Sequence, residues 1–197
     1  MQSPNSDPAL NPRQRRNRLV LWLVLALCAA PVIASFVAFY LWRPGGHVNY
    51  GELLTPKPLP DIQLTTLDGK PFRFSDMKGE WVLVTVDSAA CDERCRTQLV
   101  YTRQIRLAQA KEAERIERVW LVTDESAPDA AMLAEQPDLR VVRARGIERA
   151  LPASSDPAAH IYVVDPLGNL MMRFPANADP RRILKDVARL LRHSKWK

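Results

Sequence analysis

The feature that most restricts the architecture of this chain is an uncharged, apolar run from Leu19 to Trp42. As an α-helix, this run would be about 36 Å long, which is enough to cross a hydrocarbon layer of about 30 Å. Trp22 lies near one end, and Tyr40 and Trp42 lie at the other, as in an interfacial aromatic belt. A cleaved signal peptide has an apolar region of only about 7–15 residues. We therefore expect an uncleaved transmembrane helix at 19–42.

This run divides the net charge of the chain, which is +6 overall. Residues 1–18 form a basic tail with four arginines and the single acid Asp7, so they hold half of that charge. Only Arg43 directly follows the run, and positive charge favours the cytoplasmic side of a membrane. We expect the tail in the cytoplasm and the larger part of the chain outside it. The remaining charge is expected to spread over an ordinary solvated surface, which excludes nucleic acid as a partner.

The rest of the chain divides into a connector and one domain. Residues 43–60 contain proline and glycine but few apolar residues, which predicts a linker. Residues 61–197 are of a length typical of one globular domain. At its start, Ile62–Leu64 and Phe72–Phe74 alternate apolar and polar residues around an Asp68-Gly69 turn, which predicts a hairpin.

The domain then alternates between strands and helices. Asp179 is expected to cap the last helix, with Pro180 at its first position. This order predicts an α/β, thioredoxin-like domain with an N-terminal hairpin, tethered by one N-terminal transmembrane helix. Strands are predicted at 81–86, 119–123, 139–142, 161–164 and 170–174, and helices at 92–117, at 128–135 and from Pro180.

Cys91 and Cys95 lie just past the end of the strand predicted at 81–86, at the start of the helix that follows it. Open α/β sheets place their chemistry at the carboxyl ends of strands, and a helix N-terminus stabilises a thiolate. Residues four apart on a helix are neighbours, so both sulfurs can face one point. Two converging thiolates suit a soft metal such as Cu(I) or a reversible disulfide. The alternative is a purely structural disulfide, whose short loop gives the small end of about 2–4 kcal/mol.

The other cysteine and the histidines are weaker candidates. Cys28 lies inside the apolar run, where we expect it to pack as a small apolar side chain. His47 in the linker and His193 near the C-terminus are expected to be solvated. His160 begins a strand that lies close to the cysteine loop in this kind of fold, which makes it a candidate third metal ligand. A hydrogen-bonded histidine at a strand end is the alternative.

From Leu59 to Phe174 the sequence resembles the Sco/SenC family of membrane-anchored, thioredoxin-like copper proteins used in cytochrome c oxidase assembly. The matching pieces are the single anchor, the segments LDGKPFRFSDMKGEWVLV and DPAAHIYVVDPLGNL, and the CDERC motif after a strand. The Cys-x3-Cys spacing is the most specific, because thioredoxins use Cys-x2-Cys. The resemblance implies that Cys91 and Cys95 are Cu(I) ligands or a redox pair that acts on a copper site.

This chain departs from the family pattern around the cysteines. The family usually has proline after each cysteine, where this chain has Asp92 and Arg96. The metal-binding histidine of the family aligns with Pro157, three residues before His160. The position of the thioredoxin cis-proline falls near Ala159. These differences bear on whether a third copper ligand and a reductase activity are retained.

The resemblance implies an assembly factor in the bacterial inner membrane, with its domain in the periplasm and a protein partner in respiratory oxidase assembly. Cys91 and Cys95, with His160 as a third contact, would bind Cu(I) or manage thiol redox state at a copper site. Two alternatives stay open. The first is a metal-free, membrane-tethered thiol–disulfide oxidoreductase, which would be an enzyme. The second is a degenerate thioredoxin-fold scaffold protein.

Overall fold

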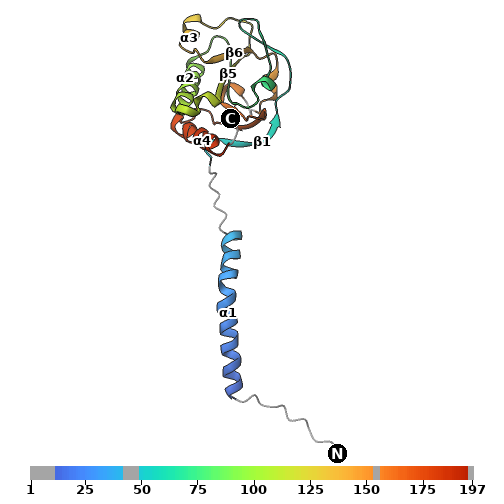
Figure 1. Cartoon of the computed structure of the whole chain (residues 1–197), viewed down its shortest axis with the longest axis vertical. Coiled ribbons are helices and arrows are strands. Elements are labelled where there is room, and N and C mark those ends of the chain that lie inside the picture. Colours follow the sequence, from blue (N-terminus) through green and yellow to red (C-terminus); the bar gives the residue numbers. More distant parts are fainter. Residues whose placement is uncertain (1–11, 42–48, 153–155, 195–197) are drawn as a thin grey trace, which may run out of the picture. The chain divides into compact units, whose positions relative to one another are not determined.

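The computed structural model describes residues 12–41, 49–152 and 156–194. The chain forms two compact units that divide between His47 and Val48. The first unit holds one helix, α1 (Pro12–Leu41) (Figure 1). Between Arg16 and Tyr40 this helix is long and apolar enough to cross a membrane, with a mean hydropathy of 2.5. It is therefore a candidate membrane span, as the sequence predicts; residues 1–11, Trp42, Arg43 and His47 lie outside the described residues.

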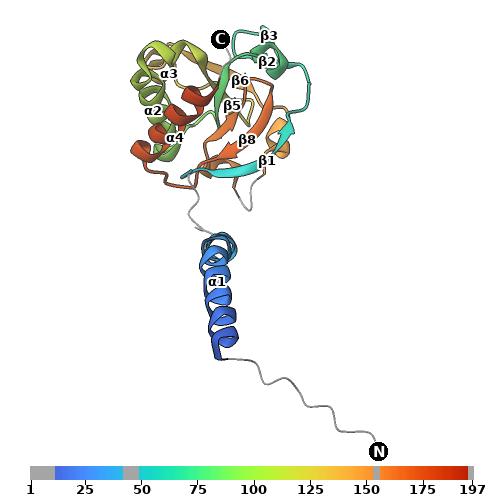
Figure 2. The same ribbon diagram turned by 60° about the horizontal axis from the view of Figure 1, so that its bottom comes forward.

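The second unit is built on one eight-stranded sheet (Figures 1 and 2) in the order β1-β8-β7-β4-β5-β6-β2-β3. Strands β4, β5 and β6 run parallel to one another, and all the remaining pairs of neighbouring strands are antiparallel. This mixed sheet with helices packed on it confirms the predicted fold class. The strands are β1 (Glu52–Pro58), β2 (Leu64–Thr66), β3 (Pro71–Phe72), β4 (Trp81–Asp87), β5 (Ile116–Val122), β6 (Leu139–Arg143), β7 (Tyr162–Val164) and β8 (Asn169–Arg173).

Helices cover the sheet unevenly. Figure 2 shows α2 and α4 beside each other on one side of the sheet, where Ile105, Ile183 and Val187 share a core cluster with Leu83. Val84 of β4 belongs to a different cluster, with residues of β2 and β3, so the central strand is buried on both faces as predicted. The helices are α2 (Glu93–Ala108), α3 (Ala130–Ala134) and α4 (Pro180–His193), and the 3-10 turns are η1 (Phe74–Met77), η2 (Ala110–Arg115), η3 (Ile147–Ala150) and η4 (Pro157–Ala159).

Two local predictions are confirmed with small shifts in their bounds. β2 and β3 form the predicted antiparallel hairpin, with Gly69 in the left-handed conformation at its turn, but Phe74 begins η1 instead of extending the strand. Asp179 caps α4, because its carboxylate accepts a hydrogen bond from the Arg181 N–H at 2.9 Å.

The prediction of one helix over residues 92–117 is wrong at its C-terminal end. α2 ends at Ala108, and β5 begins at Ile116, three residues before the predicted strand. Just past the end of α2, Ala110 adopts a left-handed conformation with φ at +52°. The strand starts earlier than predicted because Arg118 is charged but fully buried inside β5. Its guanidinium donates to the Leu99 carbonyl and to Gln136 Oε1, both at 2.7 Å, so β5 is tied to α2. Burial lowers the pKa of Arg118 to about 10.

The linker predicted at 43–60 contains a strand, because β1 pairs with β8. The residues just before it are also fixed: Asp186 Oδ2 on α4 accepts hydrogen bonds from the N–H groups of Tyr50 and Gly51, at 2.6 and 2.8 Å. A Cβ on Gly51 would lie 2.6 Å from Met172 Sδ, so only glycine permits this close approach. The globular unit therefore starts before residue 61, where the sequence analysis began it.

The sheet has an edge strand at each end, and both contain proline. β1 carries Pro56 and Pro58, and the two-residue strand β3 begins at Pro71. Because proline has no backbone N–H, it is tolerated at the edge of a sheet and not at its centre.

Candidate functional site

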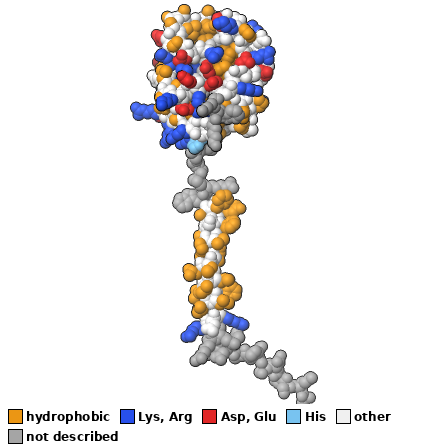
Figure 3. Space-filling view, viewed as in Figure 1, with side chains coloured by type: hydrophobic (Ala, Val, Ile, Leu, Met, Phe, Trp, Pro, Cys, Tyr) orange, Lys and Arg blue, Asp and Glu red, His pale blue; other side chains and the backbone are white. Residues whose placement is uncertain are grey.

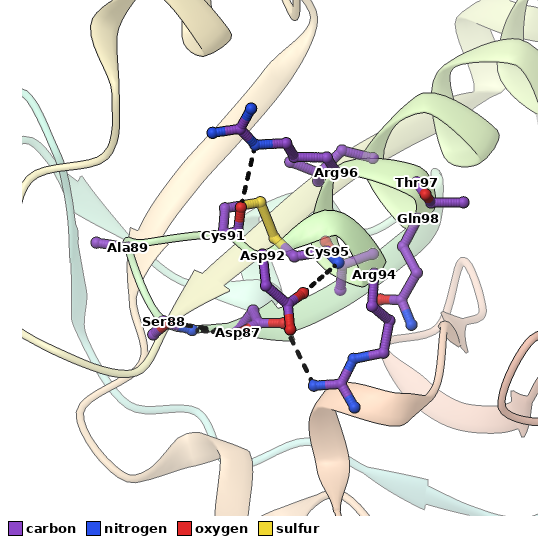
Figure 4. Close-up of a disulfide and its surroundings, with 12 residues drawn as sticks. Asp87, Ser88, Ala89, Cys91, Asp92, Arg94, Cys95, Arg96, Thr97 and Gln98 are labelled. Carbon is purple, nitrogen blue, oxygen red and sulfur yellow. Dashed lines mark hydrogen bonds and ion pairs between the residues drawn. A yellow bond between two sulfur atoms is a disulfide. The ribbon is translucent and has the colours of Figure 1, made fainter.

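The structure brings Cys91 and Cys95 together as a disulfide, with their Cα atoms 5.1 Å apart (Figure 4). The bond closes the connection between β4 and α2, at the carboxyl end of the central strand where the sequence analysis expected chemistry. The third cysteine, Cys28, is an unpaired, exposed residue of α1. The disulfide therefore involves only cysteines of the globular unit.

The loop before α2 folds around this bond through its own backbone. Cys91 adopts a left-handed conformation, with φ at +41°, and its N–H donates to the Ser88 carbonyl at 3.1 Å. The Ala89 N–H donates to Asp124 Oδ1 at 3.1 Å, which fixes the loop to the segment after β5. A tight turn thus reverses the chain directly after β4, and it delivers Cys91 to the first turn of the helix.

The residues that directly follow the two cysteines both make hydrogen bonds within the disulfide loop. Asp92 is the N-cap of α2, and its carboxylate accepts from the Cys95 N–H at 2.9 Å. Arg96 donates from Nε to the Cys91 carbonyl at 3.2 Å (Figure 4). A proline at either position could make neither side-chain contact. This chain therefore holds the geometry of the pair by polar side-chain contacts at both positions.

Apolar side chains enclose the two sulfurs. Cys91 is 1% exposed and Cys95 is 2% exposed. Both belong to a core cluster with Ala89, Leu99, Trp120, Val122 and Val141. A large reactant cannot touch either sulfur in this arrangement, so any exchange with another protein requires the loop to move away from the core.

A charged network lies on the other side of the same loop. Arg94 on α2 donates to Asp156 Oδ2 at 2.8 Å, and its guanidinium lies 3.7 Å from Asp87 Oδ2 at the end of β4. Burial raises the pKa of the Asp87 carboxyl, and the nearby carboxylates of Asp92 and Asp156 add to the rise. A hydrogen bond from the Ser88 N–H and the charge of Arg94 oppose it. A half-buried acid that holds its proton more tightly than usual thus lies four residues before Cys91.

The structure places η4, where the family histidine would align, against the start of α2. Asp156 caps η4, and Gln98 Nε2 donates to the Ala158 carbonyl at 3.1 Å. Pro157 therefore lies in a segment fixed to the cysteine helix by Arg94 and Gln98. The sequence analysis identified the position but could not detect these contacts, which join residues about 60 positions apart.

His160 is turned to a different partner. Its Nδ1–H donates to the Phe174 carbonyl at 2.8 Å, so only Nε2 could bind a metal. Within the described parts of the chain, no three His, Cys, Asp or Glu side chains are grouped so that they could hold a metal ion. The structure thus joins the two cysteines and does not bring His160 to them. His193 is exposed at the end of α4.

A cavity of about 300 Å³ adjoins this site without including either cysteine. Arg94, Gln98 and Tyr101 of α2 line one side of it, and Ile161 and Pro175 line the other. Arg94 and Gln98 are also the residues that hold η4, so this cavity and the disulfide loop share one helix turn.

These features define a class: a thioredoxin-like α/β domain with a cysteine pair where the central strand meets a helix. The family model described as "Transmembrane-like, thioredoxin-like, C-terminal domain" matches residues 81–194, more than half of the chain. The chain belongs to this family. A comparison with the sequences of characterised proteins found no match.

Solved structures share the fold. Yeast Sco1 with copper bound is 14% identical, covers 72% of this chain and 96% of its own, and has a TM-score of 0.60. Bradyrhizobium japonicum ScoI with copper bound is 21% identical, with 68% and 99% covered and a TM-score of 0.54. The thioredoxin domain of a thiol-disulfide oxidoreductase from Bacteroides vulgatus is also 21% identical, with 71% and 99% covered and a TM-score of 0.52. The resemblance to Sco proteins inferred from sequence is thus confirmed in the fold.

Proposed function

We propose that this chain is a membrane-anchored, Sco-like assembly factor for a respiratory cytochrome c oxidase. In this proposal Cys91 and Cys95 bind Cu(I) as cargo, or they manage the redox state of cysteines at the copper site of a partner protein. The observation that carries it is the cysteine pair itself, which closes the turn between the central strand and α2 in a fold shared with copper-bound Sco structures.

The donor set of the pair fits Cu(I). Reduction of the disulfide yields two neighbouring thiols at the start of α2, which can bind a metal as thiolates. Soft sulfur ligands select Cu(I) over harder ions. The apolar cluster around the sulfurs excludes water and would protect a bound Cu(I) from oxidation. His160 enters the proposal only as a third contact that would have to give up the Phe174 carbonyl first.

A second candidate function is supported by the oxidised pair and by the oxidoreductase among the structural neighbours. The dithiol form would attack a partner's disulfide, pass through a mixed disulfide, and transfer two electrons and two protons to the partner. The chain would be left with the Cys91–Cys95 bond seen here. This activity needs no metal and would make the chain a membrane-tethered thiol–disulfide oxidoreductase.

The location belongs to the same proposal. The candidate span in α1, with arginines before it, favours a single-pass protein of the bacterial inner membrane with a cytoplasmic N-terminus and a periplasmic domain. Disulfides form and persist in that oxidising compartment, so a cysteine pair there can return to its disulfide form after each reduction.

The test is an anaerobic Cu(I) competition against a chromophoric chelator, with the reduced full chain in detergent. All variants carry Cys28→Ser, so that only the pair contributes thiols. We expect one Cu(I) per chain, and a loss of affinity of at least about 100-fold in Cys91→Ser or Cys95→Ser, because one thiolate cannot replace two.

Cys28→Ser alone is the matched control and should bind as the unmodified chain does. A further His160→Ala variant measures the third contact. If the pair binds no copper but exchanges thiols with a partner disulfide, the oxidoreductase is the function. If neither reaction depends on the cysteines, both proposals are wrong and a scaffold protein is left.

A further inference from the structure

The last helix, α4, carries a stripe of positive charge that the site does not use. Its five basic residues lie within an arc of about 100° on an ideal helix, opposite the buried face formed by Ile183, Val187 and Leu191. The expectation of evenly spread charge is wrong for this helix. The basic stripe consists of Arg181, Arg182, Lys185, Arg189 and Arg192.

One acid of α4 pairs with one member of the basic stripe, because Asp186 Oδ1 lies 3.7 Å from the Arg189 guanidinium. The only acid of the helix, Asp186, is 3% exposed and is directed into the domain, where it accepts hydrogen bonds from Tyr50 and Gly51. Arg181, Lys185 and Arg192 are exposed. Lys and Arg side chains gather on this part of the domain in the space-filling view (Figure 3). The stripe thus presents a surface of one sign to solvent.

The polypeptide enters the domain directly beside this stripe. The Arg189 guanidinium donates to Asn49 Oδ1 at 3.1 Å, and the guanidinium carbon of Arg182 lies 3.9 Å above the Tyr50 ring. α1, the candidate membrane span, ends at Leu41. Eight residue steps join Leu41 to Asn49, and a fully extended chain of that length spans at most about 28 Å.

We propose that the basic stripe of α4 docks on anionic phospholipid headgroups of the membrane that holds α1. Charge complementarity and the short covalent tether select lipid over other anionic partners, because the tether keeps the stripe at high local concentration next to the headgroups. Each Lys or Arg near such a surface strengthens the attraction by about fivefold. Docking would fix the orientation of the domain above the bilayer, and it is independent of what the cysteine pair binds.

The test uses the full chain in nanodiscs, with a donor dye attached after Lys197 and acceptor dyes on lipid headgroups. Energy transfer should be greater in nanodiscs that contain phosphatidylglycerol than in nanodiscs of phosphatidylcholine alone. About 1 M salt should remove the difference, because it screens the charges. The triple variant Arg181→Gln, Lys185→Gln, Arg192→Gln should lower the ratio of docked to undocked domains about 100-fold.

The matched control removes the same charge elsewhere, with Lys57→Gln, Lys111→Gln and Arg149→Gln, all exposed residues outside α4. It should keep most of the lipid dependence. Equal transfer in the two kinds of nanodisc, or an equal loss in the control, would overturn the proposal and leave the stripe to an acidic protein. The salt dependence of the unmodified chain decides the question even if the triple variant folds poorly.

Discussion

Two segments of the domain that lack regular structure are fixed in opposite ways. The loop before α2 is closed by a covalent bond between residues four positions apart. The segment Asn49–Gly51 is held by hydrogen bonds to Asp186, about 135 positions away in the sequence. The covalent bond restricts a stretch that the helix cap Asp92 already orders. The carboxylate instead joins the two ends of the domain.

The two constraints are expected to contribute unequally to the free energy of unfolding. Closing a very short loop removes little freedom from the unfolded chain, so the disulfide contributes modestly. The buried carboxylate satisfies two backbone donors that would otherwise be left unpaired, and each such loss is costly. The disulfide is thus better suited to chemistry, and the carboxylate to holding the fold.

The largest effect is expected from Asp186→Ala, which leaves the Tyr50 and Gly51 N–H groups without their acceptor. The free energy of unfolding should fall by about 3 kcal/mol. Denaturant titration of the full chain in detergent, followed by near-ultraviolet circular dichroism, measures it. Asp179→Ala on the same helix removes an exposed cap and should cost only about 1 kcal/mol. Equal losses would show that the two acids contribute alike.

A smaller effect is expected from breaking the disulfide. Reduction should lower the free energy of unfolding by about 2 kcal/mol, as estimated for a loop this short. The comparison is the oxidised chain against the same chain in excess dithiothreitol, by the same titration. Cys91→Ala with Cys95→Ala is the control and should not respond to the reductant. A loss on reduction greater than that of Asp186→Ala would reverse the ranking of the two constraints.

The smallest effect is expected at Asp87, beside the disulfide loop. Burial raises the pKa of this carboxyl, so the folded state binds its proton more tightly than the unfolded state does. The protonated Asp87 carboxyl therefore favours the folded state at low pH, and this contribution to the free energy of unfolding is lost as the pH rises through the raised pKa. Relative to the unmodified chain, Asp87→Asn should gain stability between about pH 4 and pH 7.

Urea titrations at several pH values measure this trend, with Asp76→Asn, at an exposed position, as the control. A difference between Asp87→Asn and the unmodified chain that stays constant with pH would contradict it.

The contrast between contacts of nearby residues and contacts of distant residues also explains which parts of the fold the sequence could predict. Cys91, Cys95 and the cap Asp179 are local signals, and the structure confirms the elements around them. The linker prediction failed because β1 depends on Gly51 and Asp186, which no local pattern connects. The start of β5 was missed because a buried charge at Arg118 is paired only through the folded chain.

In the candidate site, too, the local features were predictable from the sequence and the contacts between distant residues were not. The spacing of the cysteines predicted that their two sulfurs converge. The ion pair between Arg94 and Asp156, in contrast, joins two segments that only the fold brings together. Asp87 could have been selected as the polar residue that ends a buried strand. The hydrogen bond that occupies His160 Nδ1 has no counterpart in the sequence pattern.

The prolines at both ends of the sheet bear on how copies of this chain coexist. Proteins confined to a membrane collide in two dimensions and at high effective concentration, which favours strand exchange between neighbours. Pro56 and Pro58 in β1, and Pro71 in β3, interrupt the row of donors that an invading strand would need. Edge-to-edge pairing between two copies of the domain is thereby disfavoured at both ends of the sheet.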